Sequence, residues 1–132
     1  MKSALLAWFA LVVCGVLACS RDLNQRSDRE RVTAALQFRT LADHDLANAR
    51  FVEAVGNYQE ALRIHPDDAP SYWALARIYL GLQDEARAAV YATQARQHDP
   101  HAYERETLHP VPIADPQSVA AVLAPRPMPK DA

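Results

Sequence analysis

Two consecutive stretches of the chain, 35–68 and 69–102, repeat one pattern with a period of 34 residues and no gap. The aligned positions are mostly small or apolar, and each unit has a proline near its end. The aligned pairs are Phe38 with Tyr72, Leu41 with Leu75, Ala42 with Ala76, Leu46 with Leu80, Ala54 with Ala88, Ala61 with Ala95, and Pro66 with Pro100. A fixed period of this length is typical of solenoid arrays, in which each unit buries an apolar face against the next one. The repeat therefore predicts stacked helices.

Each unit has the pattern of two amphipathic helices joined by a short turn. Apolar residues recur at helical spacing over four ranges: 28–47, 50–64, 70–80 and 85–97. The residues between these ranges favour helix ends. Ser27 or Asp28 is expected to cap the first helix, Asn48 to form a turn and cap the second, Gly81 to end the third, and Asp84 to cap the fourth.

The residues at the repeated positions resemble the tetratricopeptide repeat (TPR). That motif has an aromatic residue, Leu-Gly and Tyr on its first helix, then Ala, an aromatic residue, Ala and a closing Pro. The first unit departs from it at Asp45, where Tyr is expected, and the second at Ala92, where an aromatic residue is expected. The resemblance covers about half of the chain. It implies an all-α fold, a short right-handed α-solenoid of two TPR-like helix-turn-helix repeats.

The resemblance also implies a concave face that binds a peptide or a partner and is lined by the first helix of each unit. By register, the expected binding residues are Arg39, Asp43, Trp73, Arg77 and Leu80, with Leu36 and Leu46 beside them. Because Tyr72 takes the core position, we expect its neighbour Trp73 to point to solvent. An exposed Trp near arginines has the composition of an interaction hot spot. The competing expectation is that the chain's own tail covers Trp73 through Val119, Val122 and Leu123.

The first nineteen residues predict a targeting segment. Lys2 precedes an uncharged run over 4–18, which is too short for a comfortable membrane span and typical of a secretory signal. The run ends in Val-Leu-Ala-Cys, which resembles the bacterial lipobox. This implies removal of the signal peptide 1–18 and lipidation of Cys19. With Ser20 after the cysteine, it also implies an outer-membrane anchor facing the periplasm. The alternative is an ordinary signal that leaves a free thiol at Cys19.

Irregular segments are expected on both sides of the helical domain, 28–102. Residues 19–27 are polar, lack apolar periodicity and predict a tether from the lipidated cysteine. Residues 103–132 form a Pro-rich tail, in which Pro110, Pro112 and Pro116 prevent a continuous helix. A short helix is expected near 117–124.

The composition argues against catalysis and nucleic-acid binding. The chain has 14 Lys and Arg against 16 Asp and Glu, so it lacks a basic surface suited to nucleic acid. Its glycines form no phosphate-binding loop, and its serines lie in expected tethers, turns and caps. Pro100 separates His98 from His101, which makes convergence on a metal ion accidental. We therefore predict no catalytic residue, no metal site and no cofactor.

The sequence predicts a non-enzymatic protein–protein interaction adaptor anchored to the bacterial envelope. By fold-level analogy, it is expected to assist assembly of a secretion, pilus or outer-membrane complex. The expected partner is another envelope protein or a peptide segment, and the membrane is contacted only through the N-terminal lipid. The alternative is a structural subunit that completes its solenoid by stacking on a partner or a second copy through Val90, Tyr91 and Gln94. Oligomeric state distinguishes the two.

Overall fold

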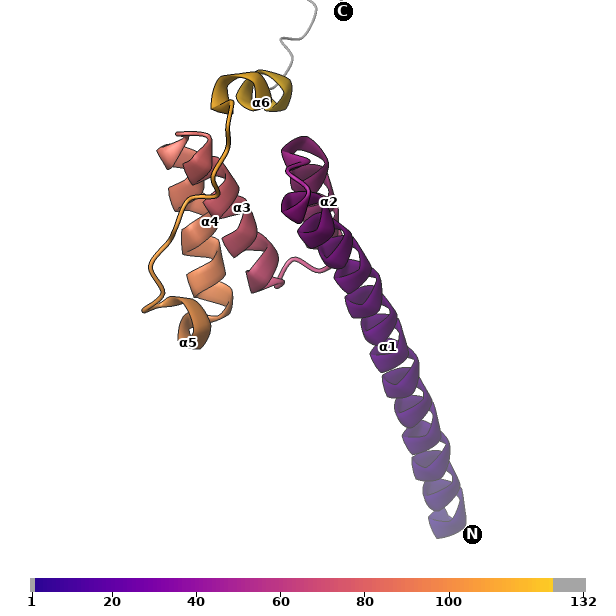
Figure 1. Ribbon diagram of the computed structural model, residues 1–132. Coiled ribbons are helices and arrows are strands. Elements are labelled where there is room, and N and C mark those ends of the chain that lie inside the picture. The colour runs from indigo at the N-terminus through magenta and orange to yellow at the C-terminus, as the bar shows by residue number, and fades with distance from the viewer. Residues whose placement is uncertain (1, 125–132) are drawn as a thin grey trace, which may run out of the picture. The chain divides into compact units, whose positions relative to one another are not determined.

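The computed structural model describes residues 2–124, with side chains from residue 25 onward. Over this range the chain forms six helices and no strand, which confirms the predicted all-α class (Figure 1). The helices are α1 (Lys2–Ala47), α2 (Phe51–Ile64), α3 (Ala69–Gly81), α4 (Glu85–His98), α5 (Pro100–Tyr103) and α6 (Pro116–Leu123). The chain divides into two compact units, Met1–Thr33 and Ala34–Ala132.

The first unit contains the N-terminal part of α1. The expected tether over 19–27 is helical, and Ser27 and Asp28 lie inside α1 rather than at its start. No Gly or Pro interrupts residues 20–47, so nothing in the sequence ends a helix that extends from the repeat. Arg26 adds an exposed i,i+4 ion pair to Glu30, with 3.3 Å between Nε and Oε1.

The predictions for the N-terminal targeting segment concern residues whose side chains the structure does not describe. The structure describes only the backbone of residues 2–24, so lipidation of Cys19 and cleavage after residue 18 stay predictions. Within the described residues, no helix has a stretch that is both long and apolar enough to cross a membrane.

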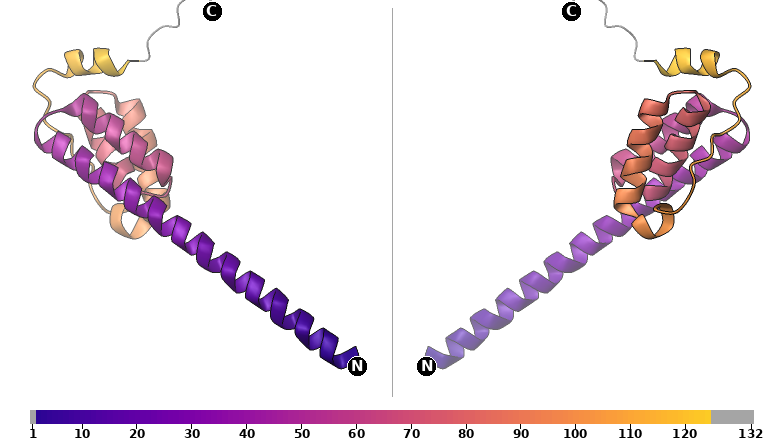
Figure 2. Two further views of the ribbon diagram at one scale, coloured as in Figure 1. Left: turned by 90° about the vertical axis from the view of Figure 1, so that its right-hand side faces the viewer. Right: turned by 90° about the vertical axis from the view of Figure 1, so that its left-hand side faces the viewer.

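The second unit contains the two predicted helix-turn-helix repeats. Residues 34–47 of α1 lie beside α2, and α3 lies beside α4 (Figures 1 and 2). The bounds of α2, α3 and α4 lie within one residue of the predicted ranges. Small residues permit this close packing: Ala42, Ala54, Ala61, Ala76 and Ala95 are completely buried. The larger side chains of the main buried cluster include Phe51, Val55, Tyr58, Leu75, Ile78 and Tyr79.

The backbone turns repeat with the same 34-residue period as the sequence. The Arg50 amide donates to the Asp45 carbonyl at 2.9 Å, and one period later the Asp84 amide donates to the Tyr79 carbonyl at 2.9 Å. The Asp84 carboxylate caps α4 as predicted, accepting from the Arg87 amide at 3.0 Å. The two 34-residue repeats therefore share local geometry as well as sequence.

One predicted helix cap differs from the structure, and one predicted helix end agrees with it. Asn48 does not cap α2, because its side-chain amide donates back to the His44 carbonyl at 2.7 Å, at the end of α1. Gly81 is the last residue of α3, as predicted, and the left-handed residue of the turn that follows is Gln83, with φ 63. The absence of a Cβ at Gly81 serves a different purpose: a Cβ there would collide with the carbonyl oxygen of Val111.

The C-terminal segment folds back onto the repeats. After α5, residues 104–115 form no regular helix and extend past α3 toward α6 (Figure 2). Val111 is buried in the main cluster, and Ile113 packs against it. α6 occupies Pro116–Leu123, where a short helix near 117–124 is expected, and Val119 and Leu123 are partly buried against the same cluster.

Candidate partner-binding face

The five predicted binding residues lie on two helices of the second unit. Arg39 and Asp43 belong to α1, and Trp73, Arg77 and Leu80 belong to α3. We call these five residues the binding face. The charged residues and Trp73 all have contact partners within the fold, and Leu80 is partly buried.

On α1, the charged residues of the binding face are paired within the fold. Arg39 forms an ion pair with Asp68, with 2.6 Å between Nη1 and Oδ1, and the two side chains are 27% and 13% exposed. Because Asp68 directly precedes α3, this pair joins α1 to the N-terminal end of α3. Arg39 is therefore held in a fixed position.

Asp43 accepts a hydrogen bond from a buried tyrosine. Its Oδ1 lies 2.5 Å from the hydroxyl oxygen of Tyr58 on α2, whose side chain is almost fully buried. Burial raises the pKa of Tyr58, and the hydrogen bond to Asp43 raises it further. Asp43 thus satisfies the polar end of a core residue while keeping its own exposure to solvent.

Trp73 contradicts the expectation that it points to solvent, since it is only 5% exposed. Its ring stacks on Tyr103 with 4.9 Å between ring centroids, and the guanidinium of Arg96 lies 5.3 Å from the Trp73 centroid. Arg96 also donates to the Tyr103 carbonyl at 3.2 Å. The prediction failed because α3 is buried on more than one side. Leu75 lies in the main buried cluster, and Trp73 lies in a second cluster that Tyr103 of α5 covers.

The chain's own C-terminal segment covers Trp73, as the competing expectation held, but other residues do so. Tyr103 and Leu108 pack against the cluster that contains Trp73, whereas Val122 is 66% exposed. Val119 and Leu123 pack against the main cluster instead. The missed residue is Tyr103, and the signal for it was an aromatic side chain directly after the second unit.

Arg77 binds the backbone of the same segment at two points. Its Nε donates to the His109 carbonyl at 3.2 Å, and its own carbonyl accepts from the Val111 amide at 3.1 Å. Gly81, one turn further along α3, gives the Val111 carbonyl room to approach. Leu80 is partly buried against the main cluster. The α3 part of the binding face therefore holds a non-helical, proline-flanked segment of its own chain.

The histidines do not form a metal site in the part of the chain that the structure describes, where no cluster of His, Cys, Asp and Glu has metal-binding geometry. His98 is engaged within the repeat: its Nδ1 lies 3.3 Å from Asp67, and its ring stacks on Tyr72 with 5.5 Å between centroids.

The chain matches no family model, and no curated protein or solved structure is significantly similar to it.

Proposed function

We propose that the protein is a non-enzymatic protein–protein interaction adaptor with a TPR-like right-handed α-solenoid of two repeats. The 34-residue period, present in both the sequence and the backbone turns, supports this fold. In this proposal the binding face takes up a proline-flanked extended segment of a partner protein.

One observation carries the proposal: α3 already holds a segment of this kind. Residues 108–113 lie along α3, with a backbone hydrogen bond from Val111 to Arg77 and a side-chain hydrogen bond from Arg77 to His109. Both hydrogen bonds are made to backbone groups of the segment, so they do not depend on its side chains, and the buried Val111 adds an apolar anchor. A partner segment with the same features would compete with the chain's own segment.

The location of the adaptor is proposed from the leader. Lipidation of Cys19 would place the protein in the bacterial envelope, with an outer-membrane anchor facing the periplasm. There it would assist assembly of a secretion, pilus or outer-membrane complex. Labelling cells with an alkyne fatty acid tests the anchor: the natural protein should be labelled and membrane-bound, and Cys19→Ala should abolish both.

The binding test uses a labelled peptide with the sequence of residues 104–115. Val111→Glu should release the internal segment from the full chain, because it places a charge in the buried cluster. We expect the peptide to bind this variant at least about tenfold more tightly than the natural chain, since the competing internal segment is lost. Addition of Gly81→Val should abolish this binding. Equal, weak binding to the natural chain and to a folded Val111→Glu variant would contradict the proposal.

A further inference from the structure

We infer that the partner segment has the sequence form Pro-Φ-Pro-Φ, in which Φ is an aliphatic residue, an inference that rests on the function proposed above. It names the sequence class that the α3 part of the binding face takes up. The chain's own residues 110–113, Pro-Val-Pro-Ile, have this form and lie against α3.

Arg77 and Gly81 bind the centre of the segment on α3, and we call these two residues the notch. The carbonyl of a helical residue points toward the residue four positions later, so the Arg77 carbonyl points toward Gly81. This carbonyl accepts from the Val111 amide at 3.1 Å, although it lies inside a helix. The approach is possible because Gly81 has no side chain, since a Cβ there would collide with the Val111 carbonyl oxygen.

The first repeat does not have the residues of the notch. By register, Asp43 and Ala47 of α1 take the places of Arg77 and Gly81. Ala47 carries the Cβ that Gly81 lacks, so a segment laid on α1 at the corresponding place would meet a methyl group. The notch is therefore a feature of the second repeat.

Alternate residues of the segment face α3. Val111 is buried and Ile113 is partly buried against the same cluster, whereas Pro110 and Pro112 are exposed. This alternation is typical of an extended chain. The Ile113 side chain also lies over Gly81, with its Cδ1 3.2 Å from the position that a Cβ would take. Val111 and Ile113 are therefore the two apolar anchors of the motif, and aliphatic side chains fit both places.

The two prolines suit this binding mode for two reasons. The Val111 amide donates to α3, and the prolines on either side of it have no N–H group that binding would leave without a partner. Proline also fixes its own φ and restricts the residue before it to extended conformations. Residues 109–112 are therefore restricted before binding, which lowers the entropy cost of ordering such a segment on α3.

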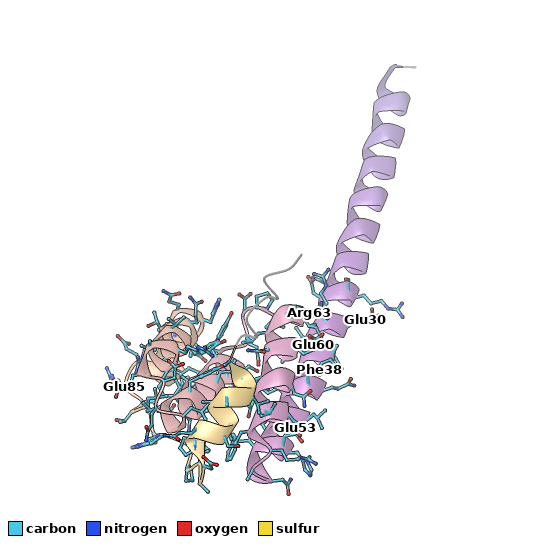
Figure 3. All side chains as sticks on the ribbon, turned by 90° about the horizontal axis from the view of Figure 1, so that it is seen from above. Glu30, Phe38, Glu53, Glu60, Arg63 and Glu85 are labelled. Carbon is cyan, nitrogen blue, oxygen red and sulfur yellow. The ribbon has the colours of Figure 1, made fainter. Side chains whose placement is uncertain are left out.

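The internal segment is held at both ends, so a partner segment displaces it only when its own sequence fits the notch well. Before the segment, α5 packs against α4, and after the segment α6 contacts α2. Figure 3 shows α6 over the end of the helices, between α2 and the pair formed by α3 and α4. Tethering gives a segment an effective concentration on the order of millimolar at its site. We therefore expect the partner segment to share the sequence form of residues 110–113.

The test uses the labelled 104–115 peptide and the full-length Val111→Glu variant, in which the internal segment is released. Methylation of the Val111 nitrogen of the peptide removes the donor to Arg77 and should weaken binding by about tenfold or more. Ile113→Ala in the peptide removes the second anchor and should weaken binding by about fivefold or more. Replacing Pro110 and Pro112 together by alanine keeps both anchors but loosens the free peptide, and should weaken binding by about threefold or more.

Glu106→Ala in the same peptide is the matched control. Glu106 is exposed and precedes the residues that lie against α3, so this peptide should bind as tightly as the natural one.

The outcomes separate this inference from the proposed function. If the natural peptide does not bind the folded Val111→Glu variant, the proposed function and the inference both fail. If the natural peptide binds and any of the three altered peptides binds equally tightly, the inference alone fails, because the corresponding part of Pro-Φ-Pro-Φ is then not recognised.

A second measurement needs no released segment. In the full-length natural chain, replacing Pro110 and Pro112 by alanine should let residues 108–113 detach from α3 more often. The protection factor of the Val111 amide against hydrogen exchange should then fall by about threefold or more. Glu106→Ala should leave this protection factor unchanged. An unchanged protection factor in the proline-free chain would show that the prolines do not pre-organise the segment, and would overturn the inference.

Discussion

Ala49 and Gln83, one repeat period apart, both adopt left-handed backbone conformations, with φ 57 and φ 63. Each residue follows the end of the first helix of its 34-residue repeat. The backbone amide of the next residue, Arg50 or Asp84, donates to the carbonyl five residues before it. Side chains with a Cβ are disfavoured in this region of the Ramachandran plot, where glycine is tolerated. Neither unit uses glycine at this position.

We therefore predict that Ala49→Gly and Gln83→Gly each raise the free energy of unfolding, by up to about 1 kcal/mol, because they relieve the left-handed strain. Ala89→Gly is the matched control, since Ala89 is an exposed residue inside α4. It should lower the free energy of unfolding by about 1 kcal/mol. Urea titrations followed by circular dichroism measure all three, and a loss of stability in Ala49→Gly would contradict the strain argument.

Gly81 gives a second prediction. Gly81→Ala should detach residues 108–113 from α3, because the new methyl group would occupy the position of the Val111 carbonyl. The Val111 amide would lose its bond to Arg77, so its hydrogen exchange should become faster. Gly56→Ala is the control. A Cβ at Gly56 meets no atom within 4 Å, so this substitution in α2 should stabilise the helix by about 0.5–1 kcal/mol.

The sequence predicted the bounds of α2, α3 and α4 to within one residue, because a strict period restricts both the spacing of the helices and the positions of their ends. The alanines that recur in the two repeats, Ala54 with Ala88 and Ala61 with Ala95, are all buried, since close helix packing needs small residues at those positions. Asp45 is instructive. It replaces the motif's Tyr and is nonetheless 4% exposed, because Arg50 and the Asn57 side chain donate to its carboxylate. Its burial depends on two polar partners from other positions, which periodicity alone does not reveal.

The position of the C-terminal segment could not be predicted in the same way. Residues 103–113 have no periodic pattern, and prolines exclude a helix without specifying where the chain lies. Trp73 was expected to be exposed for this reason, since its burial depends on Tyr103. Residues 19–27 are helical rather than irregular for a different reason: a lack of apolar periodicity does not prevent a helix that continues from a stable neighbour.

The contact between Trp73 and Tyr103 gives a third prediction. In a Trp8→Phe background, where Trp73 is the single tryptophan, Tyr103→Ala should shift the fluorescence maximum to longer wavelength because the ring becomes hydrated. It should also lower the free energy of unfolding by about 1–2 kcal/mol through loss of stacking and buried area. Tyr103→Phe keeps the ring and should preserve both properties. An unchanged spectrum in Tyr103→Ala would show that Tyr103 does not cover Trp73.

The buried hydroxyl of Tyr58 gives a prediction about pH. Burial and the hydrogen bond to Asp43 raise the pKa of Tyr58 above its ordinary value of 10.0, so the folded state holds its proton more tightly than the unfolded state does. Below pH 10 both states are protonated, and this group adds no pH dependence. Above pH 10 the unfolded state loses the proton first, so the free energy of unfolding should fall as the pH rises. Urea midpoints measured between about pH 9 and pH 11 test this decline. Tyr58→Phe should reduce its slope, whereas Tyr103→Phe removes a less buried tyrosine and should reduce it less. An equal slope in the natural chain and in Tyr58→Phe would show that Tyr58 does not control alkaline unfolding.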